Sequence, residues 1–340
     1  MRLYGKEWTR RELEARVGRI EQIAGMRRFI GTEGKETGVE QIHVRTGAGL
    51  SYYVTPTKGL DISLAEFHGV PISWQSCNGD AHPRHYEPEG SGWLRTASGG
   101  LLMTCGLMQV GSSCEDQGER LGLHGRIHHT PATQVSAESS WHEDEMEMRI
   151  AGSVEETSIF GGHLRVTRQI RSRLGENFLL IQDEVPNTGF ERCPHMILYH
   201  FNFGFPLLSE ETTIHFHSAS VQAREQQTPM GGYRAWHAPD KDYQERVYYH
   251  DTSSKPLVQI ENPNFPFHSG GANVRVSLQW SADTLPNLVQ WKMAGAGTHV
   301  LGIEPANCYV EGRRAERERG SLVFIEPGET VSYEIRLTLA

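Results

Sequence analysis

The stretch Leu164-Arg-Val-Thr-Arg-Gln-Ile170 alternates apolar and polar side chains, and Leu164, Val166 and Ile170 all lie on the same side of that alternation. Successive side chains of a β-strand point to opposite faces, so a period of two predicts a strand with one buried face. Similar short runs recur along the chain and are separated by Gly, Asn, Asp and Pro, which are typical of turns. The sequence therefore predicts a largely all-β protein.

No helical pattern of comparable quality lies between these runs, which disfavours a parallel sheet with crossover helices. No repeat of fixed length is present either, which argues against a propeller or a solenoid. We expect one large antiparallel β-sandwich. Its predicted strands are Val39 to Val44, Leu50 to Thr55, Met146 to Ile150, Leu164 to Ile170, Phe178 to Asp183, Met196 to His200, Thr213 to His217, Val274 to Trp280, Leu288 to Lys292 and Thr330 to Leu339.

One amphipathic helix is predicted before the first strand. Thr9 and Glu12 have the spacing of a capping box, and apolar residues at helical spacing then follow as far as Gly25, a plausible residue to end the helix. We therefore expect residues 1–34 to form an N-terminal helical extension and residues 35–340 to form the β-sandwich domain.

Composition limits the possible partners of the chain. The 340 residues carry a formal charge of −9, and their Lys and Arg residues are scattered, so a nucleic acid partner is not expected. There is no apolar run long enough to span a membrane, and the first seven residues carry charge where a signal peptide needs an apolar stretch. The five cysteines form no CxxC pair, which disfavours a disulfide framework. These features predict a cytoplasmic protein whose oligomeric state the sequence leaves open.

The first segment that could carry chemistry is Gly122-Leu-His-Gly-Arg-Ile-His-His-Thr-Pro-Ala132. His124 lies between glycines that let the backbone approach a ligand, and Arg126 has a fork of donors suited to sugar oxygens. A surface turn with a solvated arginine is the alternative. His128 and His129, together with His124, also raise the possibility of a metal site, but the spacing fits no established motif and chance clustering explains it equally well.

A second segment, Tyr199-His-Phe-Asn-Phe-Gly-Phe-Pro206, places His200 and Asn202 on one strand face and aromatic residues on the other. An imidazole can give and accept a proton near neutral pH, although His200 could instead be a core histidine. In the third segment, Glu304 follows an apolar run and precedes Pro305, which puts it at a strand end near a cleft mouth. Glu304 taken alone could equally be a plain surface carboxylate.

Together these three segments resemble the aldose 1-epimerase family, also called galactose mutarotase-like, and in particular a divergent bacterial branch of it. That family has a first histidine near glycine, a second histidine on a strand after an Asn-Thr-Gly-like turn, and a late Glu. Here His124, His200 after Asn187-Thr188-Gly189, and Glu304 match those positions in order and rough spacing along residues 35 to 340. The chain departs from the usual members around His200 and by carrying Arg126 in the first motif, and these departures concern the identity of the sugar more than the chemistry.

The resemblance implies a β-supersandwich fold and an enzyme that interconverts the anomers of a free sugar. It implies His200 as general acid toward the ring oxygen and Glu304 as general base toward the anomeric hydroxyl, with His124 and Arg126 holding the substrate. The chemistry itself needs only an acid and a base, and we expect them on opposite sides of the sugar. No cofactor is needed because no electrons are transferred. Further binding candidates are Asp61, Asn202 and the tryptophans Trp74, Trp93 and Trp236.

Two other functions remain open at this point. A non-catalytic sugar-binding or sensor domain could use the same cleft, because a fold does not fix an activity. An epimerase or isomerase acting at another carbon, or on a ketose, could retain the same pair but would need a stronger base or a metal. The joint presence of His200 and Glu304 favours the mutarotase.

Overall fold

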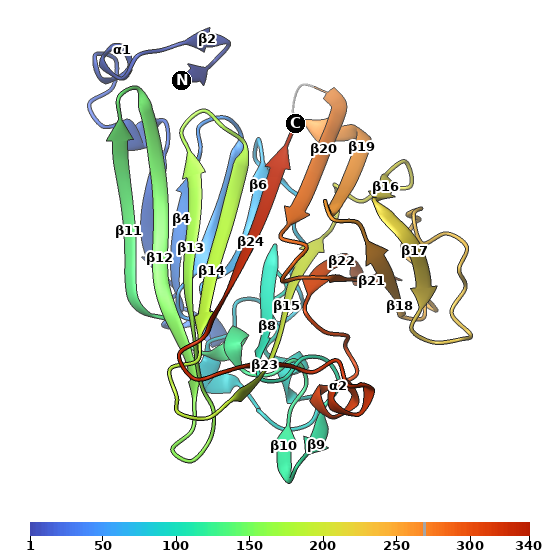
Figure 1. Cartoon of the computed structure of the whole chain (residues 1–340). Coiled ribbons are helices and arrows are strands. Elements are labelled where there is room, and N and C mark those ends of the chain that lie inside the picture. Colours follow the sequence, from blue (N-terminus) through green and yellow to red (C-terminus); the bar gives the residue numbers. More distant parts are fainter. Residues whose placement is uncertain (268–269) are drawn as a thin grey trace.

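The protein is a sandwich of two large antiparallel sheets, described here from a computed structural model that covers residues 1–267 and 270–340 (Figure 1). The smaller sheet has eight strands, and neighbours in it pair antiparallel. In spatial order they are β11 (Thr133–His142), β12 (Glu145–Thr157), β13 (His163–Arg173), β14 (Phe178–Pro186), β24 (Thr330–Leu339), β20 (Gly270–Trp280), β19 (Leu257–Phe267) and β16 (Thr213–Phe216).

The larger sheet has twelve strands and carries the functional residues described below. Its main path is β17 (Ser218–Ala223), β18 (Arg246–Thr252), β21 (Asn287–Gly295), β22 (Thr298–Ala306), β15 (Cys193–Phe203), β8 (Leu102–Leu107), β6 (Asp61–Phe67), β5 (Leu50–Thr55), β4 (Glu40–Arg45) and β3 (Gly25–Ile30). Two short strands lie off this path, β23 (Val323–Ile325) beside β15 and β7 (Val70–Pro71) beside β6.

The remaining elements lie at the ends of the sandwich. In Figure 1, α1 and the hairpin of β1 and β2 lie at one end, and α2 lies with β9 and β10 at the other. Their bounds are β1 (Arg2–Leu3), β2 (Lys6–Glu7), α1 (Arg10–Glu14), β9 (Cys114–Asp116), β10 (Glu119–Leu121) and α2 (Arg313–Arg319), with 3-10 turns at η1 (Ile20–Gln22), η2 (Gly34–Glu36), η3 (Pro83–His85), η4 (Gly92–Arg95) and η5 (Ile127–His129). None of the helices in these described residues is long and apolar enough to cross a membrane.

Both faces of the large sheet are covered near its centre. One face packs on the small sheet and forms the main core, to which Tyr199, Phe201 and Ile303 contribute. The opposite face carries a second apolar cluster that includes Met103 and Val289 and is covered by connecting segments. Burial on both faces explains why β8, β15 and β22 are buried along almost their whole length.

The N-terminal helix is much shorter than predicted. The capping box between Thr9 and Glu12 is present, but α1 ends at Glu14 and residues from Gly25 onward form β3. Between α1 and β3 the chain forms turns and η1, because Val17 and Gly18 are weak helix formers that interrupt the helical pattern. The domain boundary proposed at residue 34 stays a prediction. β3 lies before that boundary in the sequence, and it belongs to the large sheet.

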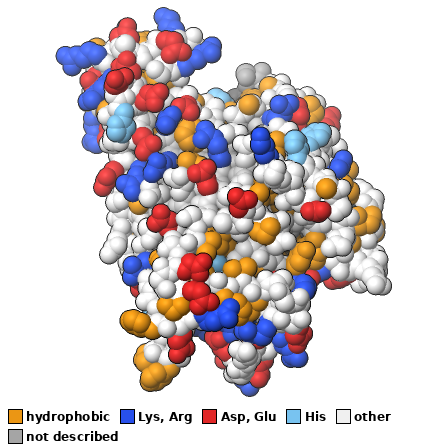
Figure 2. All heavy atoms as spheres, in the orientation of Figure 1, with side chains coloured by type: hydrophobic (Ala, Val, Ile, Leu, Met, Phe, Trp, Pro, Cys, Tyr) orange, Lys and Arg blue, Asp and Glu red, His pale blue; other side chains and the backbone are white. Residues whose placement is uncertain are grey.

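The surface matches the charge distribution expected from the sequence. Figure 2 shows basic and acidic side chains interspersed over one face of the molecule. Many are paired on the surface, for example Arg165 with Glu155 at 2.7 Å. A mixed surface of this kind is not typical of a nucleic acid interface.

Candidate active site

A cavity of about 520 Å³ opens on the face of the large sheet that points away from the small sheet. Its floor is formed by β8, β15, β22, β21 and β18, and its walls come from the connections around residues 74–97, 111–124 and 297–310. It contains five of the residues predicted from sequence, which are Trp74, Trp93, His124, His200 and Glu304.

His200 and Glu304 are neighbours on adjacent central strands. β15 and β22 pair antiparallel with Phe201 opposite Ile303, a register that places His200 beside Glu304 on the cavity face. The His200 Nε2 and Glu304 Oε1 atoms lie 3.2 Å apart, and the two side chains are 8% and 2% exposed. The expectation that they flank a sugar from opposite sides is therefore wrong: they lie side by side on one face.

A glycine makes this close approach possible. Gly302 lies two residues before Glu304 on β22 and so points to the same face. A Cβ added to Gly302 would collide with Glu304 Oε1, and would also lie 2.9 Å from Trp291 Cβ and 3.2 Å from His200 Cε1. Only a residue without a side chain leaves room for the pair.

For the sugar isomerase that the family resemblance implies, we expect Gly302→Ala to lower kcat by about 100-fold, because displacement of reacting groups by about 1 Å has effects of that size. Gly295→Ala is a suitable control on the same hairpin, since its new Cβ would meet the mobile end of Met293. The measurement is the rate of anomer exchange, with circular dichroism to verify folding. A folded Gly302→Ala variant with normal kcat would show that the spacing of the pair is unimportant.

Burial sets the protonation of the pair. It lowers the pKa of His200 to about 3, and the nearby His124 acts in the same direction. Burial also raises the pKa of Glu304 well above its usual value, and the Glu245 charge adds to this effect. Both directions favour a neutral His200 and a protonated Glu304 over the ionised pair.

His124 approaches the pair from a strained loop. It has a φ of +57°, a conformation uncommon for residues with a side chain. Its ring lies 4.9 Å from the ring of Trp93 and 6.1 Å from that of His200, measured between centroids. Burial lowers its pKa to about 4, and its Nδ1 accepts a long hydrogen bond of 3.4 Å from the Gly111 N–H. The neutral ring therefore carries its proton on Nε2.

Among the cavity residues that were not predicted from the sequence, Trp291, Arg224 and Glu245 form one hydrogen-bonded group. Trp291 lies edge-on to His200 at 5.4 Å, and its indole N–H donates to Glu245 at 2.7 Å. Arg224 donates to the other oxygen of Glu245 at 3.4 Å. Arg224 and Glu245 are the two ends of the connection between β17 and β18, and nothing in the local sequence indicates that they meet at the cavity.

The prediction of Arg126 as a cavity residue is wrong. His124 and Gly125 both have positive φ, which turns the chain so that Arg126 is exposed outside the cavity. Arg224 supplies the guanidinium group of the cavity instead.

We now expect Arg126→Lys to leave KM unchanged and Arg224→Lys to raise KM about tenfold, the effect of one lost hydrogen bond of about 1.4 kcal/mol. Lysine keeps the charge but cannot reproduce a planar fork of donors. Steady-state kinetics of the two variants on one sugar is the measurement. A raised KM for Arg126→Lys alone would restore the original assignment.

Asp61 and Asn202 also lie outside the cavity. Asp61 is 2% exposed and points between the sheets, where it accepts hydrogen bonds from Thr104 and forms an ion pair with Arg168 at 2.9 Å. Asn202 is fully buried beside His200 and donates to the carbonyl oxygens of Gly100 and His200. Neither is placed to contact a ligand. Trp236 is likewise buried elsewhere, with its indole N–H on His299.

The histidine cluster is split by the fold. His128 lies 2.6 Å from Asp61 and 3.2 Å from the Ser98 hydroxyl, while His129 bonds to Thr96. Both therefore have other partners than His124. In residues 1–267 and 270–340 no group of three His, Cys, Asp or Glu residues is arranged to hold a metal ion.

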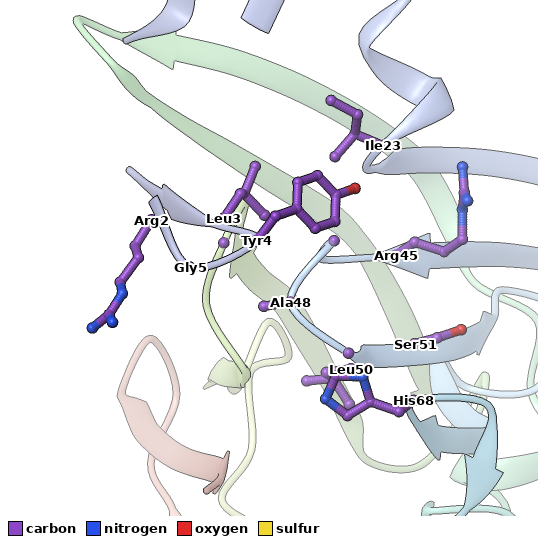
Figure 3. Close-up of a pocket in the computed structure, with 13 residues that line it drawn as sticks. Arg2, Leu3, Tyr4, Gly5, Ile23, Arg45, Ala48, Leu50, Ser51 and His68 are labelled. Atoms are coloured by element: carbon purple, nitrogen blue, oxygen red, sulfur yellow. The ribbon is translucent and has the colours of Figure 1, made fainter. Parts of the chain in front are cut away.

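A second cavity, of about 570 Å³, lies between the N-terminal residues and the β4–β5 hairpin. Figure 3 shows Tyr4 in the middle of this view, with Arg45, Ser51 and His68 around it and the side chain of Arg2 pointing away. Ser51 is already bonded to His43 at 2.7 Å, and Arg45 donates to the Glu21 carbonyl. The cavity contains none of the predicted site residues, so the first cavity is the candidate active site.

The two-sheet architecture and the position of the cavity define a protein with the galactose mutarotase-like fold. A candidate aldose 1-epimerase from Klebsiella pneumoniae is 23% identical, with a TM-score of 0.83 over 94% of this chain and 86% of its own. A galactose mutarotase-like protein from Clostridium acetobutylicum is 14% identical, with a TM-score of 0.65 over 94% and 99% of the two chains. A galactose 1-epimerase from Lactobacillus acidophilus NCFM is 11% identical, with a TM-score of 0.60 over 93% and 99%.

Within that fold the chain belongs to the family described as Domain of unknown function (DUF4432), whose model matches residues 36–339. No curated protein matches the chain. The structural similarities, all below 25% identity, establish the fold, which was predicted correctly, and leave the activity to be argued from the site.

Proposed function

We propose that the protein is an isomerase that interconverts the anomers of a free sugar, with His200 and Glu304 as its acid–base pair. The observation that carries the proposal is the contact of 3.2 Å between these side chains at the floor of a cavity. In the described part of the chain, Glu304 Oε1 has no polar neighbour at hydrogen-bond distance other than His200. Buried polar atoms usually have partners, so such an atom next to a cavity supports a role in handling a ligand.

The chemistry requires one proton to be given while another is taken. During ring opening, His200 protonates the ring oxygen as its bond to the anomeric carbon breaks. Glu304 removes the proton of the anomeric hydroxyl, whose oxygen becomes the carbonyl. Both oxygens are bonded to the same carbon, so an acid and a base that lie side by side can reach both. Rotation about the next carbon–carbon bond then exposes the other face of the carbonyl.

Ring closure reverses each transfer. Glu304 returns its proton to the carbonyl oxygen, and His200 takes the proton of the hydroxyl that attacks the carbonyl carbon. The pair therefore passes through two states, protonated His200 with ionised Glu304 and neutral His200 with protonated Glu304. The pKa directions favour the second state in the free protein, and hydrogen bonds from the sugar to Glu304 would favour the first.

Contacts around the pair support a sugar as the ligand. Trp74, Trp93 and Trp291 line the cavity and offer aromatic faces for the C–H faces of a ring. His124 presents an N–H donor beside His200, and Arg224 presents a guanidinium near the opening. We propose that these residues hold the substrate.

The experiment that tests the function is NMR exchange spectroscopy over a panel of free aldoses and ketoses. A mutarotase accelerates the exchange between the two anomer signals of at least one sugar. A folded protein that binds a sugar but accelerates no exchange would support the sugar-binding domain instead.

We expect activity to survive exhaustive treatment with EDTA, because the proposed mechanism uses side-chain proton transfer alone. The measurement is the exchange rate before and after chelation, on the same preparation. Loss of activity that one added metal restores would overturn this mechanism and bring back an isomerase that acts at another carbon.

A further inference from the structure

The acid–base pair lies in a row of side chains that runs across five adjacent strands. Met103 on β8 lies opposite His200 on β15, and Val289 on β21 lies opposite Glu304 on β22. Tyr249 on β18 is opposite Val289 in turn. Residues opposite each other in paired strands point to the same face, so the two reactive groups are flanked on both sides by apolar side chains.

The rest of the inner cavity is also apolar. Val247 lies opposite Trp291, next to Val289, and Val310, Ala97 and Trp93 complete the inner wall. These residues belong to one buried apolar cluster or pack against it. Next to the reacting atoms, a sugar would therefore contact methyl groups, a thioether and aromatic rings.

The polar side chains near the opening already bond to one another or to the backbone. The Asn78 amide donates to the Leu94 and Ala97 carbonyls at 2.8 and 2.9 Å, and Ser76 donates to Ala97. Glu245 accepts from Trp291 and Arg224. Within the described residues, the groups with hydrogen-bonding capacity left deep in the cavity are the Trp93 indole N–H, His124, His200 and Glu304.

We propose that the substrate is a deoxy sugar. Either the carbon next to the anomeric centre carries hydrogen in place of a hydroxyl, or the carbon next to the ring oxygen carries a methyl group in place of a hydroxymethyl group. This inference rests on the proposed function, since it places the anomeric oxygen and the ring oxygen on Glu304 and His200. The carbon beside the anomeric centre then lies toward Val289 and Val247, and the carbon beside the ring oxygen lies toward Met103. A hydroxyl at either place would lose its water without gaining a partner.

The expected preference has a definite size. An apolar pocket discriminates against an analogue that adds one hydroxyl by about 10- to 100-fold in kcat/KM. We expect glucose and galactose to be processed more slowly, by such a factor, than their 2-deoxy or 6-deoxy analogues. Each rate is divided by the spontaneous rate of the same sugar, and the two analogues show whether the Val289 side or the Met103 side carries the preference.

Val289→Thr is the sharpest variant because it replaces a methyl group by a hydroxyl of nearly the same size. It should lower the preference for the deoxy sugar about tenfold by giving the added hydroxyl a partner. Val276→Thr is the matched control, since Val276 is equally buried but lies in β20 of the other sheet. It should leave the preference unchanged.

Two readouts separate this proposal from the proposed function. Exchange rates report catalysis, and quenching of tryptophan fluorescence reports binding through the tryptophans that line the cavity. Equal or faster exchange with the fully hydroxylated sugars would overturn the substrate class and leave the mutarotase intact. Selective binding of deoxy sugars without faster exchange would keep the substrate class and overturn the catalytic function. Equal binding of both sugar types without catalysis would overturn both.

Discussion

Replacing His200 with Ala or Glu304 with Gln is expected to lower kcat by about 100-fold or more, the usual contribution of a positioned acid or base. The double variant should be little worse than either single variant. Each transfer in the proposed mechanism needs its partner, so once one group is lost the other has no concerted step to assist. The measurement is the decay of optical rotation of a freshly dissolved sugar that the wild-type protein accepts.

Matched controls separate chemistry from folding. His250→Ala removes another buried histidine, and Glu156→Gln changes a partly buried carboxyl group, and neither residue lines the cavity. Both controls should keep a normal kcat when folded, as judged by circular dichroism. A folded Glu304→Gln variant with a near wild-type rate would remove Glu304 from the reaction.

Replacing Arg168 with Met should destabilise the protein by about 3–5 kcal/mol, the usual cost of removing one partner of a buried ion pair. Arg168 is 1% exposed and bonds to Asp61 at 2.9 Å and to Asp183 at 2.7 Å. Methionine fills a similar volume but leaves both carboxyl groups without their cation between the sheets. Urea unfolding of the wild-type and variant proteins gives the free energy difference.

Arg165 on the same strand provides the control for this change. Its ion pair with Glu155 is exposed, with relative side-chain exposures of 43% and 46%. Exposed pairs contribute about 0–1 kcal/mol, so Arg165→Met should have little effect on unfolding. Equal destabilisation by the two substitutions would show that the buried ion pairs of Arg168 contribute no more to the free energy of unfolding than the exposed pair of Arg165 does.

The fold was predictable wherever one strand face is buried and the other is exposed. The alternation from Leu164 to Ile170 lies within β13, and the run from Leu50 to Thr55 coincides with β5. β8 was missed because the large sheet is covered on both faces there, so its side chains are apolar without alternation. The long helix was predicted wrongly because its pattern of apolar spacing contains the weak helix formers Val17 and Gly18, and the chain forms turns and η1 there.

The site residues were predictable only where their neighbours in the sequence form a recognisable short motif. His124, His200 and Glu304 each stand beside glycine, proline or an aromatic strand, and all three line one cavity. The prediction that Arg126 lines the cavity failed because the positive φ angles of His124 and Gly125 turn the chain just before it. Arg224 and Trp291 reach the cavity through the pairing of β17, β18 and β21, and such register is a long-range property that local sequence does not encode.

His200 and Glu304 lie on neighbouring central strands, while the opening of the cavity is formed by connecting segments. The geometry of the pair and the shape of the opening can therefore change independently in evolution. β15 and β22 are held by ladders on both sides, so the distance between His200 and Glu304 is fixed by the sheet itself. The opening of the cavity is formed by connections such as residues 224–245, which tolerate insertion and replacement far better than a buried strand does. New sugars could thus be accepted through changes in loop length and composition while the proton-transfer geometry stays untouched.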